Sequence, residues 1–167
     1  VQLLGAQLML SLVVPVYGNE ESIPALLETV LSLDAALQSR FEAVFVVDGS
    51  PDRSLEILSE QLPLAPFRSQ LIALSRNFGS FSAIVAGLRA ARGDYFAVMS
   101  AALQEPPALV LEFSRILAED AADIVVGTRS GRADPFWTRM ASQVFWSAYR
   151  HLVQPQIPRG GIDVFAC

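Results

Sequence analysis

Charged side chains are scarce in this sequence: only 17% of its 167 residues are charged, against 52% that are hydrophobic. A chain of this length and composition is expected to form one domain with a large core. Lysine is absent, so that all 12 basic residues are arginine, and the formal net charge is −5. Because surfaces that bind nucleic acid are strongly basic, this charge argues against a nucleic-acid partner.

Cysteine is nearly absent, and long hydrophobic runs are missing. The one cysteine, Cys167, excludes a disulfide framework within the chain and favours a reducing, cytoplasmic compartment. Residues 1–16 are apolar, but they are few, include Gln2 and Gln7, and lack a basic leader. These features argue against a signal peptide or a membrane-spanning helix. Since the sequence starts without Met and ends directly after a motif, we expect a single domain over residues 1–167 that is truncated at its C-terminal end.

Short apolar runs alternate with segments of helical periodicity. Strands are expected at residues 8–16, 43–47, 70–74, in the first half of 94–107 and at 123–127. Helices are expected at 23–37, directly after Asp52, and at 81–91, 108–119 and 136–152, with a loop at 63–67. Strands that alternate with helices form a sheet covered on both faces, so the pattern predicts an α/β sandwich with a mostly parallel sheet.

The chain is organised around residues 94–107. Their first half is a buried strand, their second half turns small and polar, and Pro106 and Pro107 suit the first turn of a following helix. In open α/β sheets, ligands bind at the carboxyl ends of the strands, which makes this corner a candidate site. The alternative is that the stretch is merely a strand–turn–helix corner.

Residues 100–107 read Ser-Ala-Ala-Leu-Gln-Glu-Pro-Pro, which resembles the Asp-x-Asp-Leu-Gln-Asp-Pro-Pro motif of family 2 glycosyltransferases. The likeness is strongest to polyprenyl-phosphate sugar transferases of the dolichyl-phosphate mannose synthase type. In that family the two aspartates hold Mg²⁺ or Mn²⁺ against a nucleotide-sugar diphosphate, and here they are replaced by Ser100 and Ala102. Gln104 remains as a weak metal ligand, with Glu105 as another oxygen donor. Since these cations prefer carboxylates, metal binding is expected to be weakened or lost.

The first strand leads into a second similar motif. Residues 14–21 read Val-Pro-Val-Tyr-Gly-Asn-Glu-Glu and resemble the family's Val-Pro-Val-Tyr-Asn-Glu-Glu. The resemblance implies that Pro15, Tyr17 and Glu20 (or Glu21) line the nucleobase of the donor. Alone, the segment is also compatible with a simple junction between a strand and a helix cap.

Residues 46–52, Val-Val-Asp-Gly-Ser-Pro-Asp, resemble the family's Val-Asp-Asp-Gly-Ser-x-Asp, with Val47 in place of the first aspartate. The resemblance implies that Asp48 accepts hydrogen bonds from the uracil or guanine edge or from the ribose, since a carboxylate accepts from two donors at once. Taken alone, Asp48 and Asp52 are ordinary turn and cap residues.

Residues 74–79, Leu-Ser-Arg-Asn-Phe-Gly, match the family's Leu-Ser-Arg-Asn-Phe-Gly-Lys, whose Lys falls on Ser80. The resemblance places Arg76 at the nucleotide-sugar site, together with Ala101 and Gln104 of the central stretch. A structural salt bridge is the other interpretation of Arg76.

Two later segments complete the resemblance. Residues 124–132 resemble the family's Val-Val-x-Gly-x-Arg-x-x-Arg, so that Arg129 and Arg132 would face the donor diphosphate or the acceptor phosphate. A solvated pair of loop arginines is the alternative. Residues 158–165 resemble the acceptor segment, with Asp163 as a general base or phosphate-orienting carboxylate. Arg129 and Asp163 are therefore the candidate catalytic residues.

The resemblance covers residues 10–165 and implies the nucleotide-diphospho-sugar transferase fold, a GT-A, Rossmann-like three-layer fold. The implied activity is sugar transfer from a UDP- or GDP-sugar to a polyprenyl phosphate or a glycan, at the cytoplasmic face of a membrane. One alternative is a degenerate member that binds a nucleotide or a partner without turnover. Another is a nucleotide-free scaffold whose aromatic, basic helix at 136–152 docks on a membrane or on another subunit, as in a homo-oligomer. The same helix is equally compatible with packing on the sheet.

Overall fold

The computed structural model describes residues 8–127 and 164–167. In chain order, its elements are β1 (Leu10–Val16), α1 (Ile23–Ala36), β2 (Phe41–Asp48), α2 (Ser54–Gln61), the 3-10 helix η1 (Leu62–Leu64), β3 (Ser69–Leu74), α3 (Ser80–Ala90), β4 (Tyr95–Val98), α4 (Ala108–Ala118), β5 (Val125–Gly127) and β6 (Val164–Ala166). The chain divides into two compact units, one of Val1–Val125 with Ala166–Cys167 and one of Val126–Phe165. In the second unit, the described residues belong to the neighbouring strands β5 and β6.

Four parallel strands build the sheet of the first unit, in the order β3-β2-β1-β4. β1 lies inside this sheet, where Val13 pairs with Val44 of β2 on one side and with Val98 of β4 on the other. The chain runs outward from β1 through β2 to β3 and then crosses back to place β4 on the other side of β1. The carboxyl ends of β1 and β4 therefore form a topological switch point, the place where open α/β sheets bind ligands.

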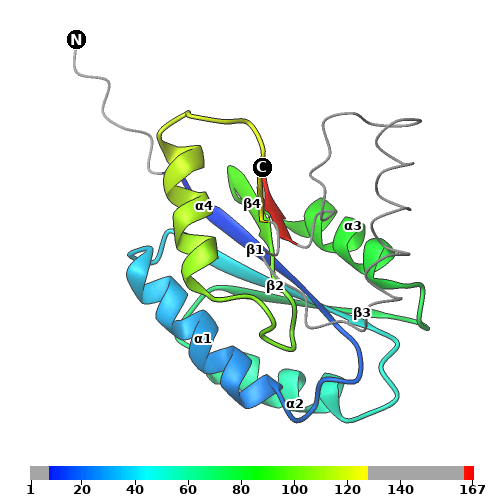
Figure 1. Cartoon of the computed structure of the whole chain (residues 1–167). Helices are drawn as coiled ribbons and strands as arrows, with labels where there is room; N and C mark the ends of the chain where they lie inside the picture. The colour runs from blue at the N-terminus through cyan, green and yellow to red at the C-terminus, as the bar shows by residue number, and fades with distance from the viewer. Residues whose placement is uncertain (1–7, 128–163) are drawn as a thin grey trace, which may run out of the picture. The chain divides into compact units, whose positions relative to one another are not determined.

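Helices cover both faces of this sheet, with α1, α2 and α4 on one face and α3 on the other (Figure 1). Gly87, which is buried, allows α3 to pack closely against the sheet. A side chain at Gly87 would overlap with Val13 and lie 3.1 Å from Cγ2 of Val46. The backbone of α3 therefore rests directly on β1 and β2.

The core of the first unit is centred on β1 and β2. Every residue of β2 is buried, and its two large aromatic side chains, Phe41 and Phe45, are fully enclosed. Burial of one such side chain contributes about 1.5–3 kcal/mol to the free energy of folding. This arrangement explains the continuous apolar runs of the sequence, because strands covered on both faces show no alternation of polar and apolar residues.

One carboxylate is buried at the amino end of the sheet, opposite to the switch point. Glu42 accepts hydrogen bonds from the Ser11 hydroxyl at 2.6 Å, the Arg92 backbone N–H at 2.6 Å and the Gln70 side-chain amide at 3.2 Å. Burial raises the pKa of Glu42, but these hydrogen bonds, led by that of Ser11, hold the pKa below its usual value. The ionised Glu42 thus ties together the starts of three strands and the α3–β4 loop.

The α/β class with a mostly parallel sheet is confirmed, and several predicted boundaries are corrected. β1 begins at Leu10 rather than at residue 8. The backbone N–H of Met9 donates to the Asp94 side chain at 2.8 Å instead of to the backbone of a neighbouring strand. β2 spans Phe41–Asp48 and so extends beyond residues 43–47 at both ends, since pairing with β1 starts at Phe41. The expected loop at 63–67 begins inside η1.

One strand was not predicted. β6 is antiparallel, with Ala166 beside Ala97, and Phe96 and Cys167 exchange backbone hydrogen bonds of 2.7 and 2.8 Å. It is only three residues long, too short to give a periodicity in the sequence. The helix expected at 136–152 lies outside the described residues. Within residues 8–127 and 164–167, no helix has the length and apolar character needed to cross a membrane.

Candidate functional site

Four loops leave the sheet at the carboxyl ends of β1, β2, β3 and β4. They comprise residues 17–22, 49–53, 75–79 and 99–107. Because the four strands are parallel, the loops share one edge, which contains the switch point. The predicted site residues at this edge are Pro15, Tyr17, Glu20, Asp48, Arg76, Ala101 and Gln104.

Glu20 and Asp52 fasten the loop after β1 to the loop after β2. The Glu20 backbone N–H donates to Oδ2 of Asp52 at 2.9 Å, and Oε2 of Glu20 accepts from the Arg53 backbone N–H at 2.9 Å. Oδ1 of Asp52 accepts from the Ser50 hydroxyl at 2.5 Å and the Ser54 backbone N–H at 3.1 Å. Partial burial alone would raise the pKa of Asp52, but these hydrogen bonds, with that of Ser50 foremost, lower the pKa to about 2. Asp52 is therefore ionised at neutral pH.

Ser50 makes a second link between the same two loops. Its Oγ accepts from the Gly18 backbone N–H at 2.8 Å while it donates to Asp52. Gly18 has a φ of +66°, a left-handed conformation that favours glycine. The neighbouring Tyr17 N–H donates to Oδ1 of Asn19 at 3.0 Å, and the Tyr17 side chain is 50% exposed. Tyr17 is thus presented to solvent on a loop whose backbone is held from several sides.

Asp48 fixes the loop after β3. This side chain is 3% exposed, and its two oxygens accept from the backbone N–H groups of Phe78 and Gly79, both at 2.8 Å. Gly49, with a φ of +59°, packs so closely that a side chain there would overlap with the backbone of Arg76 and Asn77. The segment Asp48–Gly49 therefore sets the position of the Arg76 backbone.

Arg76 is an exposed cation at this edge. Its guanidinium carbon lies 4.8 Å from the centroid of the Phe78 ring, a cation–π contact. No carboxylate of the described residues forms a salt bridge with Arg76. The structural salt bridge considered as an alternative is thus not found in the described part of the chain, and the guanidinium group can face an anionic ligand.

The loop after β4 carries Ser100 and Ala102, the positions expected to have held the cation. Oγ of Ser100 accepts from the Ala102 backbone N–H at 3.2 Å, and the Glu105 carboxylate folds back to accept from the Ser100 backbone N–H at 3.2 Å. Leu103 has a φ of +51° in this turn. The Ser22 hydroxyl, from the loop after β1, donates to the Ala101 carbonyl at 3.0 Å and so joins the two sides of the switch point.

These residues do not fit a Mg²⁺ or Mn²⁺ ion. Such an ion takes hard oxygen ligands, usually including one or two carboxylates. The one carboxylate of the loop, Glu105, is already bonded to the backbone of the same turn. Across the part of the chain that the structure describes, no three His, Cys, Asp or Glu side chains are grouped so that they could hold a metal. Gln104 is exposed on the loop, and its assignment as a weak ligand stays a prediction.

The structure brings the predicted residues of four motifs to one edge of the sheet. Two of these residues, Glu20 and Asp48, also form hydrogen bonds with the backbone of neighbouring loops. The Glu20 carboxylate bonds the Arg53 backbone, and Asp48 bonds the loop after β3, so both have a positioning role beside the predicted contact with the nucleotide. Arg129, Arg132 and Asp163 lie outside the described residues, and their roles stay predictions.

Asp52 is not the N-cap residue of α2, and the links made by Ser50 and Ser22 are not among the predicted contacts. Arg53 occupies the N-cap position of α2, while Asp52 bonds the Ser54 N–H from one residue earlier. Hydroxyl and carboxyl residues directly after a strand, as in Asp-Gly-Ser-Pro-Asp, were a usable signal for Ser50. Ser22 had no local signal, since its partner is 79 residues away.

The sequence that builds this edge matches the model of a known family. The model of glycosyl transferase family 2 matches residues 11–166, and the chain belongs to this family. A curated relative, the undecaprenyl-phosphate 4-deoxy-4-formamido-L-arabinose transferase of Photorhabdus laumondii, is 38% identical over 136 residues. That match covers 80% of this chain and 41% of the relative, so the chain spans about two fifths of the relative's length. The family predicted from the motifs is confirmed.

Solved structures of glycosyltransferases share the fold. The Pyrobaculum calidifontis mannosyltransferase PcManGT, in complex with GDP-Man and Mn²⁺, aligns with a TM-score of 0.66 and 18% identity over 96% of this chain and 44% of that chain. S. aureus TarS 1-349 in complex with UDP aligns with a TM-score of 0.59 and 22% identity over 76% of this chain and 38% of that chain. The likeness is one of fold, and it confirms the GT-A class.

Proposed function

We propose that this chain is the donor-binding part of a glycosyltransferase that moves a sugar from a UDP- or GDP-sugar to the phosphate of a polyprenyl phosphate. Membership of family 2 supports the reaction class, and the name of the relative from Photorhabdus laumondii supports a polyprenyl phosphate as the acceptor. The observation that carries the proposal is the interlocked edge at the switch point, where four family motifs meet. A lipid acceptor requires access to a membrane surface, and we propose that this is the cytoplasmic face.

The residues of the edge divide into two groups in this proposal. Tyr17 and Pro15 face the nucleobase, and Asp48 contacts the base or ribose through the lone pairs that its two backbone hydrogen bonds leave free. Arg76, which is exposed and free of carboxylate partners in the described part of the chain, faces the diphosphate together with Gln104 and the backbone near Ala101. The hydrogen bonds between the loops hold these groups in place before the ligand binds, and this lowers the entropic cost of binding.

The reaction is a single displacement. A phosphate oxygen of the acceptor forms a bond to the anomeric carbon while the bond from that carbon to the donor's β-phosphate oxygen breaks. The products are a glycosyl polyprenyl phosphate and UDP or GDP. Because the acceptor phosphate is already anionic, no base has to remove a proton, and Asp163 orients rather than deprotonates the acceptor. Negative charge grows on the leaving diphosphate, where the guanidinium groups of Arg129 and Arg132 stabilise it.

We further propose that nucleotide binding here does not need a divalent cation. The positions that would hold one are Ser100 and Ala102, and Glu105 is bonded within its own turn. A bound cation stabilises developing charge by several kcal/mol, and each 1.36 kcal/mol is a factor of ten in rate. Turnover should therefore be slower than in a variant that carries both Ser100→Asp and Ala102→Asp.

The proposal is tested by product formation. A panel of radiolabelled UDP- and GDP-sugars is incubated with a short-chain polyprenyl phosphate in detergent, and labelled lipid is separated from labelled donor. Labelled lipid from one donor is expected. Nucleotide binding without product from any donor would instead identify a degenerate member that binds without turnover.

Two matched variants make the test specific to the edge. Arg76→Gln removes the cation at the edge and should lower product formation by about tenfold or more, as expected when a charged contact with a phosphate is lost. Arg115→Gln removes the same charge from α4, away from the loops, and should leave product formation within about twofold. Equal effects of the two changes would contradict the assigned role of Arg76.

A further inference from the structure

The arginines are distributed unevenly along the chain. Residues 61–93 contain no Asp or Glu, but they include Arg68, Arg76, Arg89 and Arg92. The other eight arginines share the rest of the sequence with all 17 acidic residues. A protein with a net charge of −5 therefore has a continuous basic segment at residues 61–93, and α3 lies within it; residues 135–162, with Arg139, Arg150 and Arg159, form another.

The outer face of α3 is apolar where a helix on a sheet is normally polar. Its buried residues are the small Ala83 and Gly87, whereas Phe81 is 83% exposed and Val85 is 46% exposed. Phe81, Val85 and Arg89 are spaced by four residues and so lie on one face of the helix. We call this face, with Phe78 in the preceding loop, the α3 stripe.

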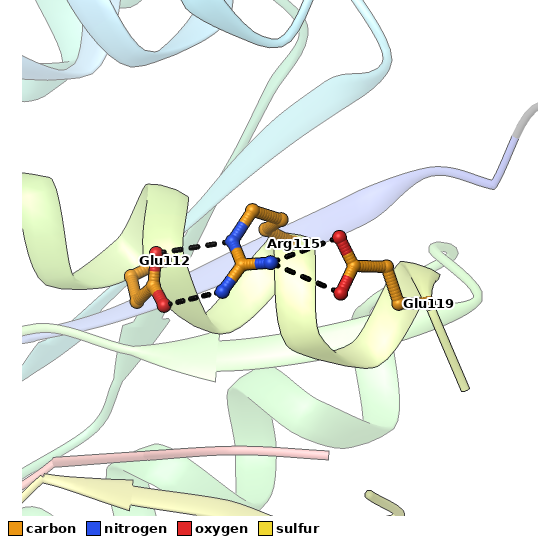
Figure 2. A network of polar contacts seen from close by, with 3 residues as sticks. All are labelled: Glu112, Arg115 and Glu119. Atoms are coloured by element: carbon orange, nitrogen blue, oxygen red, sulfur yellow. Dashed lines mark hydrogen bonds and ion pairs between the residues drawn. The ribbon is translucent and has the colours of Figure 1, made fainter. Parts of the chain in front are cut away.

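On the other face of the sheet, the arginine of α4 is paired with carboxylates. On α4, Arg115 is held between Glu112 at 2.7 Å and Glu119 at 2.9 Å, and the hydrogen bond of Glu112 leads in raising the pKa of Arg115 (Figure 2). α3 has no acidic residue, and Arg89 forms no salt bridge with any described residue. Exposed aromatic side chains beside unpaired arginines are typical of a helix that lies in the interface of an anionic membrane.

The position of the α3 stripe, next to the candidate site, fits an anionic membrane surface as its partner. Phe78, 47% exposed, begins the stripe, and the Phe78 backbone is bonded to Asp48 at the candidate site. We propose that the α3 stripe docks on the surface of an anionic lipid bilayer and thereby brings the edge with Arg76 close to the lipid headgroups. This inference rests on the proposed function, since the phosphate of a lipid acceptor lies at that depth.

The test uses the complete chain and sedimentation with lipid vesicles. Vesicles of phosphatidylcholine with phosphatidylglycerol are compared with vesicles of phosphatidylcholine alone. We expect binding to the anionic vesicles that weakens at high salt. The double change Phe81→Ser with Val85→Ser should weaken binding by about tenfold or more, since burial of apolar side chains drives insertion. Arg89→Gln should weaken it by about fivefold, the contribution of one cation near such a surface.

Two variants of matched chemistry control for loss of apolar area and of charge. Leu64→Ser changes a side chain that is 85% exposed on η1, and Arg115→Gln removes one positive charge from α4; both should bind vesicles as the unchanged protein does. If the stripe variants bind anionic vesicles as well as these controls, or if the unchanged protein does not bind, the proposal is overturned. A stripe variant that converts a dimer to a monomer in sedimentation velocity, without vesicle binding by the unchanged protein, would assign the stripe to a second copy instead.

The outcome is separable from that of the proposed function. None of Phe81, Val85 and Arg89 is assigned to the site, so transfer to a short-chain acceptor in detergent should be unchanged in the stripe variants. If sugar transfer is observed without vesicle binding, the proposed membrane docking of the α3 stripe is overturned and the proposed function stands. If the α3 stripe binds vesicles but no transfer is observed, the proposed function is overturned and the docking stands.

Discussion

Asp52→Asn is the change that best tests the hydrogen bonds between the loops after β1 and β2. Asparagine has the same shape, and its oxygen can replace Oδ1, which accepts from Ser50 and Ser54. Its NH₂ group would then face the Glu20 backbone N–H, which now donates to Oδ2 at 2.9 Å. Two donors would face each other, and the negative charge that strengthens all of these hydrogen bonds would be lost.

The magnitude follows from the pKa of Asp52, which folding lowers from 3.8 to about 2. At 1.36 kcal/mol for each pH unit, this difference corresponds to at most about 2.4 kcal/mol of stability at pH 7. Since the carboxylate is only partly buried, solvent screening reduces the expected loss to about 1–2 kcal/mol.

The sign of the pH dependence is fixed by the same pKa. A carboxylate whose pKa is lowered by folding stabilises the protein above its unfolded pKa of 3.8, and this stability is lost as the pH falls towards about 2. Urea denaturation of both proteins at pH 7 and pH 3 measures the effect. The difference in free energy of unfolding at pH 3 should be about half of that at pH 7. A difference below about 0.5 kcal/mol at pH 7, or one of equal size at both pH values, would refute the role given to Asp52.

Three further changes test other parts of the account. Gly49→Ala forces a side chain at a φ of +59° against the backbone of Arg76, so we expect a loss of more than about 2 kcal/mol in urea denaturation, and weaker UDP or GDP binding in calorimetry. Glu42→Gln places two amide groups face to face with Gln70 at the far end of the sheet; it should lower stability by about 1–3 kcal/mol while nucleotide affinity stays within twofold. Ser100→Asp combined with Ala102→Asp should make nucleotide binding about tenfold tighter with Mn²⁺ than with EDTA, and equal affinities in the two conditions would show that the loop cannot hold a cation.

Much of the fold could be predicted because its central strands are covered on both faces. The apolar runs at β1 and β2 and the helical spacing of 108–119 are direct consequences of burial, and they indicate the α/β class without any knowledge of pairing. β6 could not be predicted, because three residues become a strand only through pairing with β4.

The sequence predicts which residues lie at this edge of the sheet, but not the contacts between its loops. The motifs gave the residues after each strand, and parallel strands bring those residues to one edge. The bond from Ser22 to Ala101 and the exchange between Glu20, Asp52 and Arg53 depend on how separate loops approach each other. The sequence contains no local pattern for such contacts, so the positioning roles of Glu20 and Asp48 emerge only from the folded chain.

The central claim is that a nucleotide site persists at the switch point although its cation ligands have been replaced by Ser100 and Ala102. The most direct measurement is calorimetric titration of the unchanged protein with UDP and with GDP, once in EDTA and once in Mn²⁺. We expect saturable binding of at least one nucleotide, with dissociation constants that agree within about twofold between the two conditions. Binding that is seen only with Mn²⁺, or no binding of either nucleotide in both conditions, would contradict it.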